Sequence, residues 1–291
     1  MALFDEHFLK KLEYLNIVSR KLFAGRMRAE RQTKKVGAGI EFADHRDYAP
    51  GDDYRYLDWN VYGRLDRLLV RLFHEEEELY IYLLLDCSRS MLTGAFSKFD
   101  QARRIVAALS YVGLANLDRV NIISFGDALR EELPPRRGKG QIFTILDFLE
   151  KLETRGVTNL QESVRALVHG RRRRGLAVVA SDFFDPRGYE DALKLLGYMG
   201  FGVYAVHLVA PEDRYPNLSG EVEMVDIELG SARLVTIDES ALAGYKRAFE
   251  NYIDGLEKFC LSRGFGYVRT PTEVEFQEVV LKIFRYGGFL R

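Results

Sequence analysis

The sequence predicts an α/β fold in which a doubly wound, mostly parallel sheet is flanked by helices. Two observations support this prediction. Four short, mostly apolar runs occur at 79–85, 120–125, 176–180 and 201–209, and such runs are typical of strands buried on both faces of a parallel sheet. Helical patterns alternate with these runs over about 200 residues, which is the order of elements in a doubly wound domain.

The helical patterns repeat apolar residues at helical spacing. The first spans 97–116 and begins with Ser97-Lys98-Phe99-Asp100, which matches a capping box. Five more helices are predicted near 142–152, 159–169, 187–198, 239–263 and 273–285. A hairpin-like insertion at 221–238, with Gly230-Ser231 near its tip, interrupts the alternation.

Changes in composition divide the chain into three segments. Residues 1–35 contain a helix near 5–23 and a basic run, residues 36–78 form a β-rich subdomain, and residues 79–291 form the α/β domain. Glycines, aromatics and charges interleave in 36–78 without a helical period. We expect its arginines and aspartates to form buried or half-buried ion pairs, and its aromatic residues to pack against the sheet. A partner-recognition surface is the alternative.

The bulk composition argues against a nucleic-acid-binding protein, a disulfide-stabilised secreted protein and a membrane-spanning protein. The chain has 291 residues, a formal net charge of -1 and only two cysteines, Cys87 and Cys260, which lack CxxC spacing. This charge argues against a nucleic-acid partner, and the cysteine usage favours a reducing compartment. The N-terminal segment is amphipathic, and no stretch approaches the roughly 18 charge-free apolar residues of a membrane span. We therefore expect a cytoplasmic, globular protein.

Oxygen-bearing side chains follow the predicted strands at one edge of the sheet. Asp86, Ser88 and Ser90 occupy alternate positions after the first strand, so in extended chain their side chains point the same way. Thr158 lies in a Gly156-Val157-Thr158-Asn159 loop, and Asp182 lies in the Ser181-Asp182 pair that follows the third strand. Because open α/β sheets bind ligands beyond the carboxyl ends of their strands, we expect these three loops to meet.

This all-oxygen set indicates a site for a hard divalent cation rather than for zinc. Mg²⁺ is the first choice, with Mn²⁺ and Ca²⁺ as alternatives. Three hydroxyls and two carboxylates leave such an ion incompletely saturated, so that a carboxylate of another protein could complete its shell. For two of these residues a purely structural role, as a helix cap or a turn residue, is the alternative. Thr158 also begins a capping box, Thr158-Asn159-Leu160-Gln161, and Asp182 could be a turn or capping residue.

The five residues together resemble the metal-ion-dependent adhesion site of von Willebrand factor A-type domains, which is written DxSxS…T…D. Asp86, Ser88, Ser90, Thr158 and Asp182 match all five positions. The resemblance implies that the serines and the threonine contact the metal directly, while the aspartates often act through water. It also implies one antiparallel edge strand in a Rossmann-type parallel sheet, here near 129–133.

The segment before the sheet carries motifs that point to one particular family of proteins. It contains GAGIEF at 37–42, HRDY at 45–48, GDDYR at 51–55, LDWN at 57–60, Arg64, LVR at 69–71 and four acidic residues at 75–78. This string is similar to the signature of the bacterial family called "domain of unknown function 58" (DUF58). Relatives in that family are commonly encoded beside MoxR-type AAA+ ATPases and often beside transglutaminase-like membrane proteins. The resemblance implies a non-enzymatic interaction module whose partner is a MoxR-type ATPase or its client, with a place beside membrane complexes as a further option.

Two other functions are weaker alternatives. A metal-dependent phosphohydrolase would use Asp86 as nucleophile or metal ligand, but Ser88 stands where its second carboxylate is expected and no general base is evident. An adaptor that binds nucleic acid or a membrane surface would use the basic segments 20–35 and 171–174. Because the net charge of the chain is close to zero, this adaptor is the least favoured of the three functions.

Overall fold

The computed structural model describes residues 3–23, 32–37, 41–76, 79–94, 97–170, 172–228 and 230–286. The chain divides into two compact units, of which the larger contains residues 1–20 and 79–290 and the smaller contains residues 21–78. This division differs from the expected one, because the N-terminal helix belongs with the α/β unit. In α1 (Glu6–Phe23) the Phe8 ring lies 4.9 Å from that of Phe276, and Lys11 pairs with Glu275.

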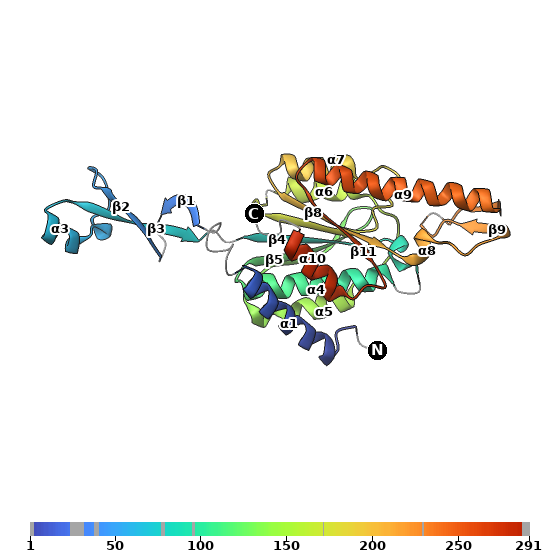
Figure 1. The fold of residues 1–291 in the computed structure, drawn as a ribbon, viewed down its shortest axis with the longest axis horizontal. Helices are drawn as coiled ribbons and strands as arrows, with labels where there is room; N and C mark the ends of the chain where they lie inside the picture. Colours follow the sequence, from blue (N-terminus) through green and yellow to red (C-terminus); the bar gives the residue numbers. More distant parts are fainter. Residues whose placement is uncertain are drawn as a thin grey trace. The chain divides into compact units, whose positions relative to one another are not determined.

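The larger unit contains a six-stranded sheet with the strand order β11-β8-β7-β4-β5-β6 (Figure 1). Its strands are β4 (Tyr80–Asp86), β5 (Arg119–Phe125), β6 (Leu129–Arg136), β7 (Leu176–Ser181), β8 (Gly202–Val209) and β11 (Gly266–Pro271). All neighbours pair in parallel except β5 and β6, which pair antiparallel. The mostly parallel sheet and the antiparallel edge strand near 129–133 are thus confirmed.

Helices cover both faces of this sheet. One layer contains α6 (Leu160–His169), α7 (Glu190–Tyr198) and α9 (Glu239–Ser262), and the other contains α1, α4 (Lys98–Ala115), α5 (Ile142–Lys151) and α10 (Phe276–Tyr286) (Figure 1). Tyr82 and Leu84 of β4 pack into one core with α6, α7 and α9. Ile81, Leu83 and Leu85 alternate with them and are also buried. This two-sided burial explains why the strand is apolar at nearly every position.

Two elements of the larger unit lie outside the alternation. The predicted hairpin is confirmed as β9 (Gly220–Val225) and β10 (Ala232–Ile237), which pair antiparallel with each other. Strand β11 was not predicted, because it contains Arg269, ends in Pro271 and has only Val268 and Thr270 buried. An edge strand tolerates such residues, and its parallel pairing with β8 determines its conformation.

The smaller unit is an antiparallel sheet with one short helix. Its strands β1 (Gln32–Gly37), β2 (Glu41–Asp47) and β3 (Leu69–Glu76) lie in the order β1-β3-β2. The strands agree with the expected β-rich subdomain, whereas helix α3 (Trp59–Leu65) was not predicted. The Asp58 side chain caps this helix by accepting hydrogen bonds from the backbone N–H groups of Asn60 and Val61.

The ion pairs of the smaller unit are more exposed than expected, although the His45–Asp58 pair is half-buried, with side chains 27% and 16% exposed. Arg46 pairs with Asp52 at 2.6 Å and holds the pKa of that carboxyl down at about 2, but the Arg46 side chain is 46% exposed. The pairs Arg55–Asp53 and Arg67–Asp47 are also at the surface. Exposed ion pairs contribute little stability, typically about 0–1 kcal/mol. Within the smaller unit, the side chains of Tyr54, Trp59 and Tyr62 are not buried, and the rings of Trp59 and Tyr62 meet edge to face with centroids 6.2 Å apart.

Some sequence-based expectations lie outside the described residues. They concern Arg26, Arg28 and Arg31 of the basic run, Arg171 of the basic quartet, and residues 38–40 and 77–78 of the family signature. Among the helices of the described ranges, none combines the length and the apolar character needed to cross a membrane.

Candidate metal centre

The candidate centre begins at the carboxyl end of β4, the strand between β5 and β7. Asp86 ends this strand, and the backbone N–H of Cys87 still bonds the carbonyl of Phe125 at 2.8 Å. One carboxylate oxygen of Asp86 accepts a hydrogen bond from the Ser88 N–H at 2.9 Å, which turns the chain. The loop therefore takes its shape from Asp86 itself.

Ser88 and Ser90 lie close together, although the reason differs from the predicted one. The chain is extended only as far as Ser88, and a 3₁₀ turn follows over Arg89–Leu92. This turn places the Ser88 and Ser90 hydroxyl oxygens 3.0 Å apart, next to the Asp86 carboxylate. Asp86 and Ser88 are fully buried, and Ser90 is nearly so. The juxtaposition of these three residues agrees with the sequence analysis.

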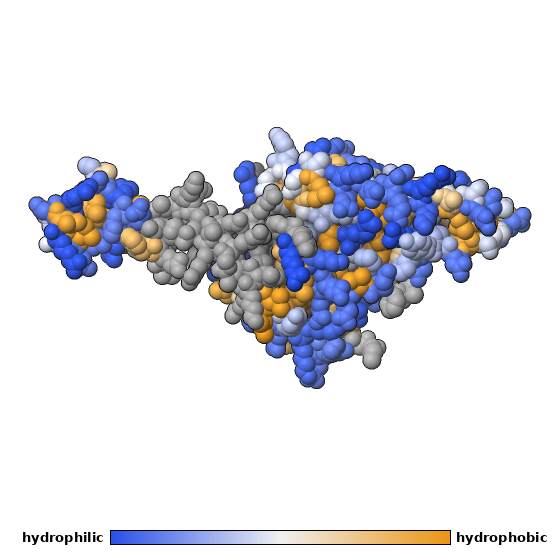
Figure 2. All heavy atoms as spheres, viewed as in Figure 1, coloured by the Kyte–Doolittle hydropathy of each residue, from blue (hydrophilic) through white to orange (hydrophobic). Residues whose placement is uncertain are grey.

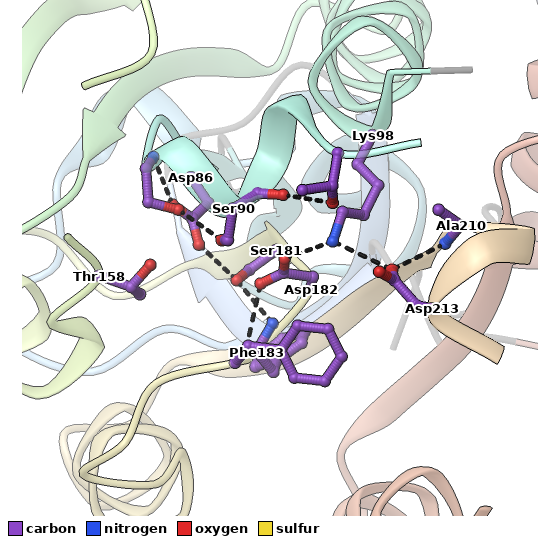
Figure 3. Close-up of polar contacts among 12 residues, drawn as sticks. Asp86, Ser90, Lys98, Thr158, Ser181, Asp182, Phe183, Ala210 and Asp213 are labelled. Atoms are coloured by element: carbon purple, nitrogen blue, oxygen red, sulfur yellow. Dashed lines mark hydrogen bonds and ion pairs between the residues drawn. The ribbon is translucent and has the colours of Figure 1, made fainter. Parts of the chain in front are cut away.

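Thr158 belongs to a second loop that is bonded to the first. The Arg89 N–H donates to the Gly156 carbonyl at 3.2 Å, and the Thr158 hydroxyl points toward the Asp86 carboxylate (Figure 3). Helix α6 is capped by Asn159, whose side chain accepts from the Glu162 N–H at 3.1 Å. Thr158 is therefore not the helix cap, which removes the simpler role for this residue.

The third loop follows β7 and places Ser181 and Asp182 beside the first. The Ser181 hydroxyl donates to the second oxygen of Asp86 at 2.6 Å. Asp182 is fully buried, and one of its oxygens accepts from the Phe184 N–H at 3.1 Å. Asp182 thus has the turn role that the sequence analysis left open, and it lies within the cluster around Asp86 (Figure 3).

A buried lysine, which no pattern in the sequence indicated as part of the site, neutralises Asp182. Lys98 lies at the start of α4 with its side chain 1% exposed, and its Nζ lies 2.7 Å from an oxygen of Asp182 and 3.0 Å from one of Asp213 (Figure 3). Burial alone would lower the pKa of Lys98, but the two carboxylates outweigh it and raise that pKa. Asp213 belongs to the short helix α8 (Pro211–Arg214).

Asp86 has no such cationic partner among the described residues. Burial, and then the charge of Asp182, raise the pKa of the Asp86 carboxyl to about 7. A buried carboxylate without a cation is costly, and the groups around Asp86 are hydroxyls and backbone N–H groups. The donor set therefore fits a hard cation, with Ser88, Ser90 and Thr158 as direct ligands and with Asp86 and Asp182 beside them.

The thiol that neighbours Asp86 in the sequence bonds elsewhere. The Cys87 thiol is buried, and it lies 3.6 Å from the Leu85 carbonyl. Within the described ranges, no group of three or more His, Cys, Asp or Glu side chains is placed to hold a metal. The cluster at Asp86 consists mainly of neutral hydroxyl groups, which the spacing of Asp86, Ser88 and Ser90 in the sequence had indicated.

A carboxylate from the hairpin also reaches the centre. Glu228, which lies between β9 and β10, accepts hydrogen bonds from the Thr158 N–H and from the Thr158 hydroxyl, both at 3.2 Å. The two residues are 70 positions apart in the chain. No local pattern could have indicated this contact, since it depends on how the hairpin folds back over the loop.

The mostly parallel six-stranded sheet, with helices on both faces and Asp86-Cys87-Ser88-Arg89-Ser90 at the end of the inner strand β4, defines a doubly wound α/β domain. The chain belongs to the family described as "Protein of unknown function DUF58", whose model matches residues 44–252. The uncharacterized protein Rv1480 of Mycobacterium tuberculosis is 28% identical over 252 residues, which cover 84% of this chain and 78% of that protein.

Two solved structures are similar at lower identity. BatB from Bacteroides thetaiotaomicron, a conserved hypothetical protein, is 16% identical with a TM-score of 0.44, and the match covers 70% of this chain and 97% of BatB. The VWA domain of SpRpn10 is 13% identical with a TM-score of 0.40, and the match covers 71% of this chain and 95% of that domain.

Proposed function

We propose that this chain is a non-enzymatic, metal-dependent protein-interaction module of the cytoplasm. Ser88, Ser90 and Thr158 would hold a divalent cation, Mg²⁺ in the first place and Mn²⁺ or Ca²⁺ as alternatives, with Asp86 and Asp182 in support. Such an ion supplies Lewis acidity toward a carboxylate of a partner protein. The observation that carries the proposal is the convergence of oxygen donors on Asp86, a buried carboxylate without a cationic partner among the described residues.

The hydrogen bonds of the centre favour binding over hydrolysis. Both oxygens of Asp86 already accept hydrogen bonds, from the Ser88 N–H and from the Ser181 hydroxyl. Both oxygens of Asp182 are likewise engaged, by the Phe184 N–H and by Lys98. A hydrogen bond donated to a carboxylate oxygen stabilises its negative charge and so weakens that oxygen as a nucleophile toward phosphorus. The neutral hydroxyls of Ser88 and Ser90 suit the binding of an external anionic ligand instead.

Metal binding is tested by titrating Mn²⁺ into the protein by calorimetry. We expect Asp86→Asn and Ser90→Ala to lower the affinity by about 10–100-fold, the usual effect of removing a group that ligates or orients a metal ligand. Asp147→Asn, at the exposed surface of α5, is the matched control and should bind as the wild type does. Equal affinity in all four proteins, or no binding by the wild type, would refute the metal site.

The partner is tested separately from the metal. By resemblance to its family, the chain would bind a MoxR-type ATPase or a client of that ATPase, also beside membrane complexes. We expect the immobilised protein to retain the ATPase or the client in Mg²⁺ and to release it in EDTA, and Asp86→Asn to retain neither. Retention that EDTA leaves unchanged would contradict capture through the metal. Turnover of a phosphate ester that Asp86→Asn abolishes would favour the phosphohydrolase.

A further inference from the structure

Glu228 is the acidic residue of the hairpin that turns inward. Its neighbours Asp226 and Ile227 are exposed, whereas Glu228 is half-buried. Its two carboxylate oxygens accept separately from the backbone N–H and from the side-chain hydroxyl of Thr158. Glu228 therefore engages the same hydroxyl that the proposed function assigns to the metal.

Hydrogen bonds within the turn orient this carboxylate. The Glu228 N–H donates to the Asp226 side chain at 2.8 Å, and the Gly230 N–H donates to the Asp226 carbonyl at 2.8 Å. The Asp226 N–H in turn bonds the Ser231 carbonyl at 2.8 Å. Gly230 has a φ of +70°, which a glycine adopts without strain. The turn therefore presents Glu228 to Thr158 in a defined conformation.

The hairpin that carries Glu228 is separate from the main sheet. Strands β9 and β10 pair only with each other among the described strands. Met224, Val225 and Leu234 are half or more exposed, and Figure 2 shows apolar side chains at the surface over this hairpin. The hairpin can consequently move away from Thr158 without breaking a hydrogen bond of the six-stranded sheet.

We propose that Glu228 is an internal occupant of the centre, which competes with the carboxylate of a partner for the place beside Thr158. This inference rests on the proposed function, because Glu228 would compete for the position that the carboxylate of a partner takes. The chemistry of the two competitors is the same, and an attached carboxylate acts at a high effective concentration. A partner then binds only the fraction of molecules in which the hairpin has opened, and its apparent affinity falls by that fraction.

The first measurement uses acetate as the probe carboxylate and Mn²⁺ as the metal. Acetate is titrated into the Mn²⁺-loaded protein, and water-proton relaxation reports the water that it displaces from the ion. We expect Glu228→Ala to bind acetate about tenfold more tightly than the wild type, as when roughly a tenth of the molecules are open. Glu223→Ala, an exposed change on β9 of the same hairpin, should bind acetate as the wild type does.

The second measurement needs no metal. The Thr158 amide donates its hydrogen to Glu228, so its exchange with deuterium reports the contact directly. We expect this amide to exchange roughly ten times faster in Glu228→Ala than in the wild type or in Glu223→Ala. Equal exchange in the three proteins would overturn the inference, because the hairpin would not protect Thr158.

The remaining outcomes separate this inference from the proposed function. If Mn²⁺ binds while acetate affinity is the same in wild type and Glu228→Ala, the internal occupant is refuted and the metal site stands. If Mn²⁺ affinity itself falls about tenfold in Glu228→Ala, Glu228 is a permanent ligand and not a competitor, which also overturns the inference. If none of the proteins binds Mn²⁺, the proposed function fails and the occupant role fails with it.

Discussion

Replacing Lys98 by methionine is expected to destabilise the larger unit by about 3–5 kcal/mol, the usual effect of removing one partner of a buried ion pair. The Lys98 side chain is 1% exposed, and its ammonium group contacts Asp182 and Asp213 at 2.7 Å and 3.0 Å. Methionine fills most of the volume of the lysine stem, but it leaves two carboxylates without their cation. Urea denaturation followed by circular dichroism measures the loss.

A matched variant separates this effect from the removal of a positive charge in general. Lys151 pairs with Asp147 across one helical turn at 2.7 Å, but its side chain is 73% exposed. Lys151→Met should therefore change the free energy of unfolding by no more than about 0.5 kcal/mol. Adding Asp182→Asn to Lys98→Met should recover part of the stability, because it removes one of the unpaired charges. A Lys98→Met protein as stable as Lys151→Met would contradict the buried pair.

Replacing Phe125 by alanine is expected to cost about 3–5 kcal/mol, the range measured for emptying a buried aromatic site. Phe125 ends β5, is fully buried and belongs to the core between the sheet and α6, α7 and α9. Its carbonyl also accepts the hydrogen bond of the Cys87 N–H, so the cavity would lie next to the candidate metal loop. Thermal unfolding compared at one protein concentration measures the change.

Phe143 provides the control for this variant. It is also a phenylalanine of the larger unit, on α5, but 66% of its surface is exposed. Phe143→Ala removes the same atoms without opening a cavity, and it should change the free energy of unfolding by less than about 0.5 kcal/mol. Equal losses in the two variants would show that the core around Phe125 is not packed as described.

The fold was predictable where burial leaves a local pattern. Strands β4, β5, β7 and β8 are buried on both faces, so each appears in the sequence as a mostly apolar run, interrupted in β5 by Asn121 and Ser124 and in β8 by His207. Helices α4, α6 and α9 begin at side-chain caps, Ser97, Asn159 and Asp238. By contrast, β11 has no such pattern, because an edge strand is held by its hydrogen bonds to β8 rather than by its own apolar residues.

The candidate site also contains residues that the sequence could predict and features that only the structure decided. Asp86, Ser88 and Ser90 were identifiable because they directly follow a recognisable strand and carry their chemistry within five residues. The sequence could also place Asp182 at the same edge, since the carboxyl ends of parallel strands meet there. Thr158 lies between α5 and α6, so its place at that edge followed from the resemblance to the five-residue pattern rather than from a strand end. It left open whether Thr158 caps a helix, and the geometry of Asn159 decided that question.

The sequence by itself determined the parallel sheet, the edge where its loops meet and the oxygen donors at that edge. Only the tertiary structure decided how their charges are balanced. In the sequence, Lys98 is one polar residue at a helix start and Glu228 is one of several acids in a hairpin. Their partners lie 84 and 70 residues away. Contacts over such separations depend on packing and leave no periodic pattern in the chain, so folding alone places Lys98 on Asp182 and Glu228 on Thr158.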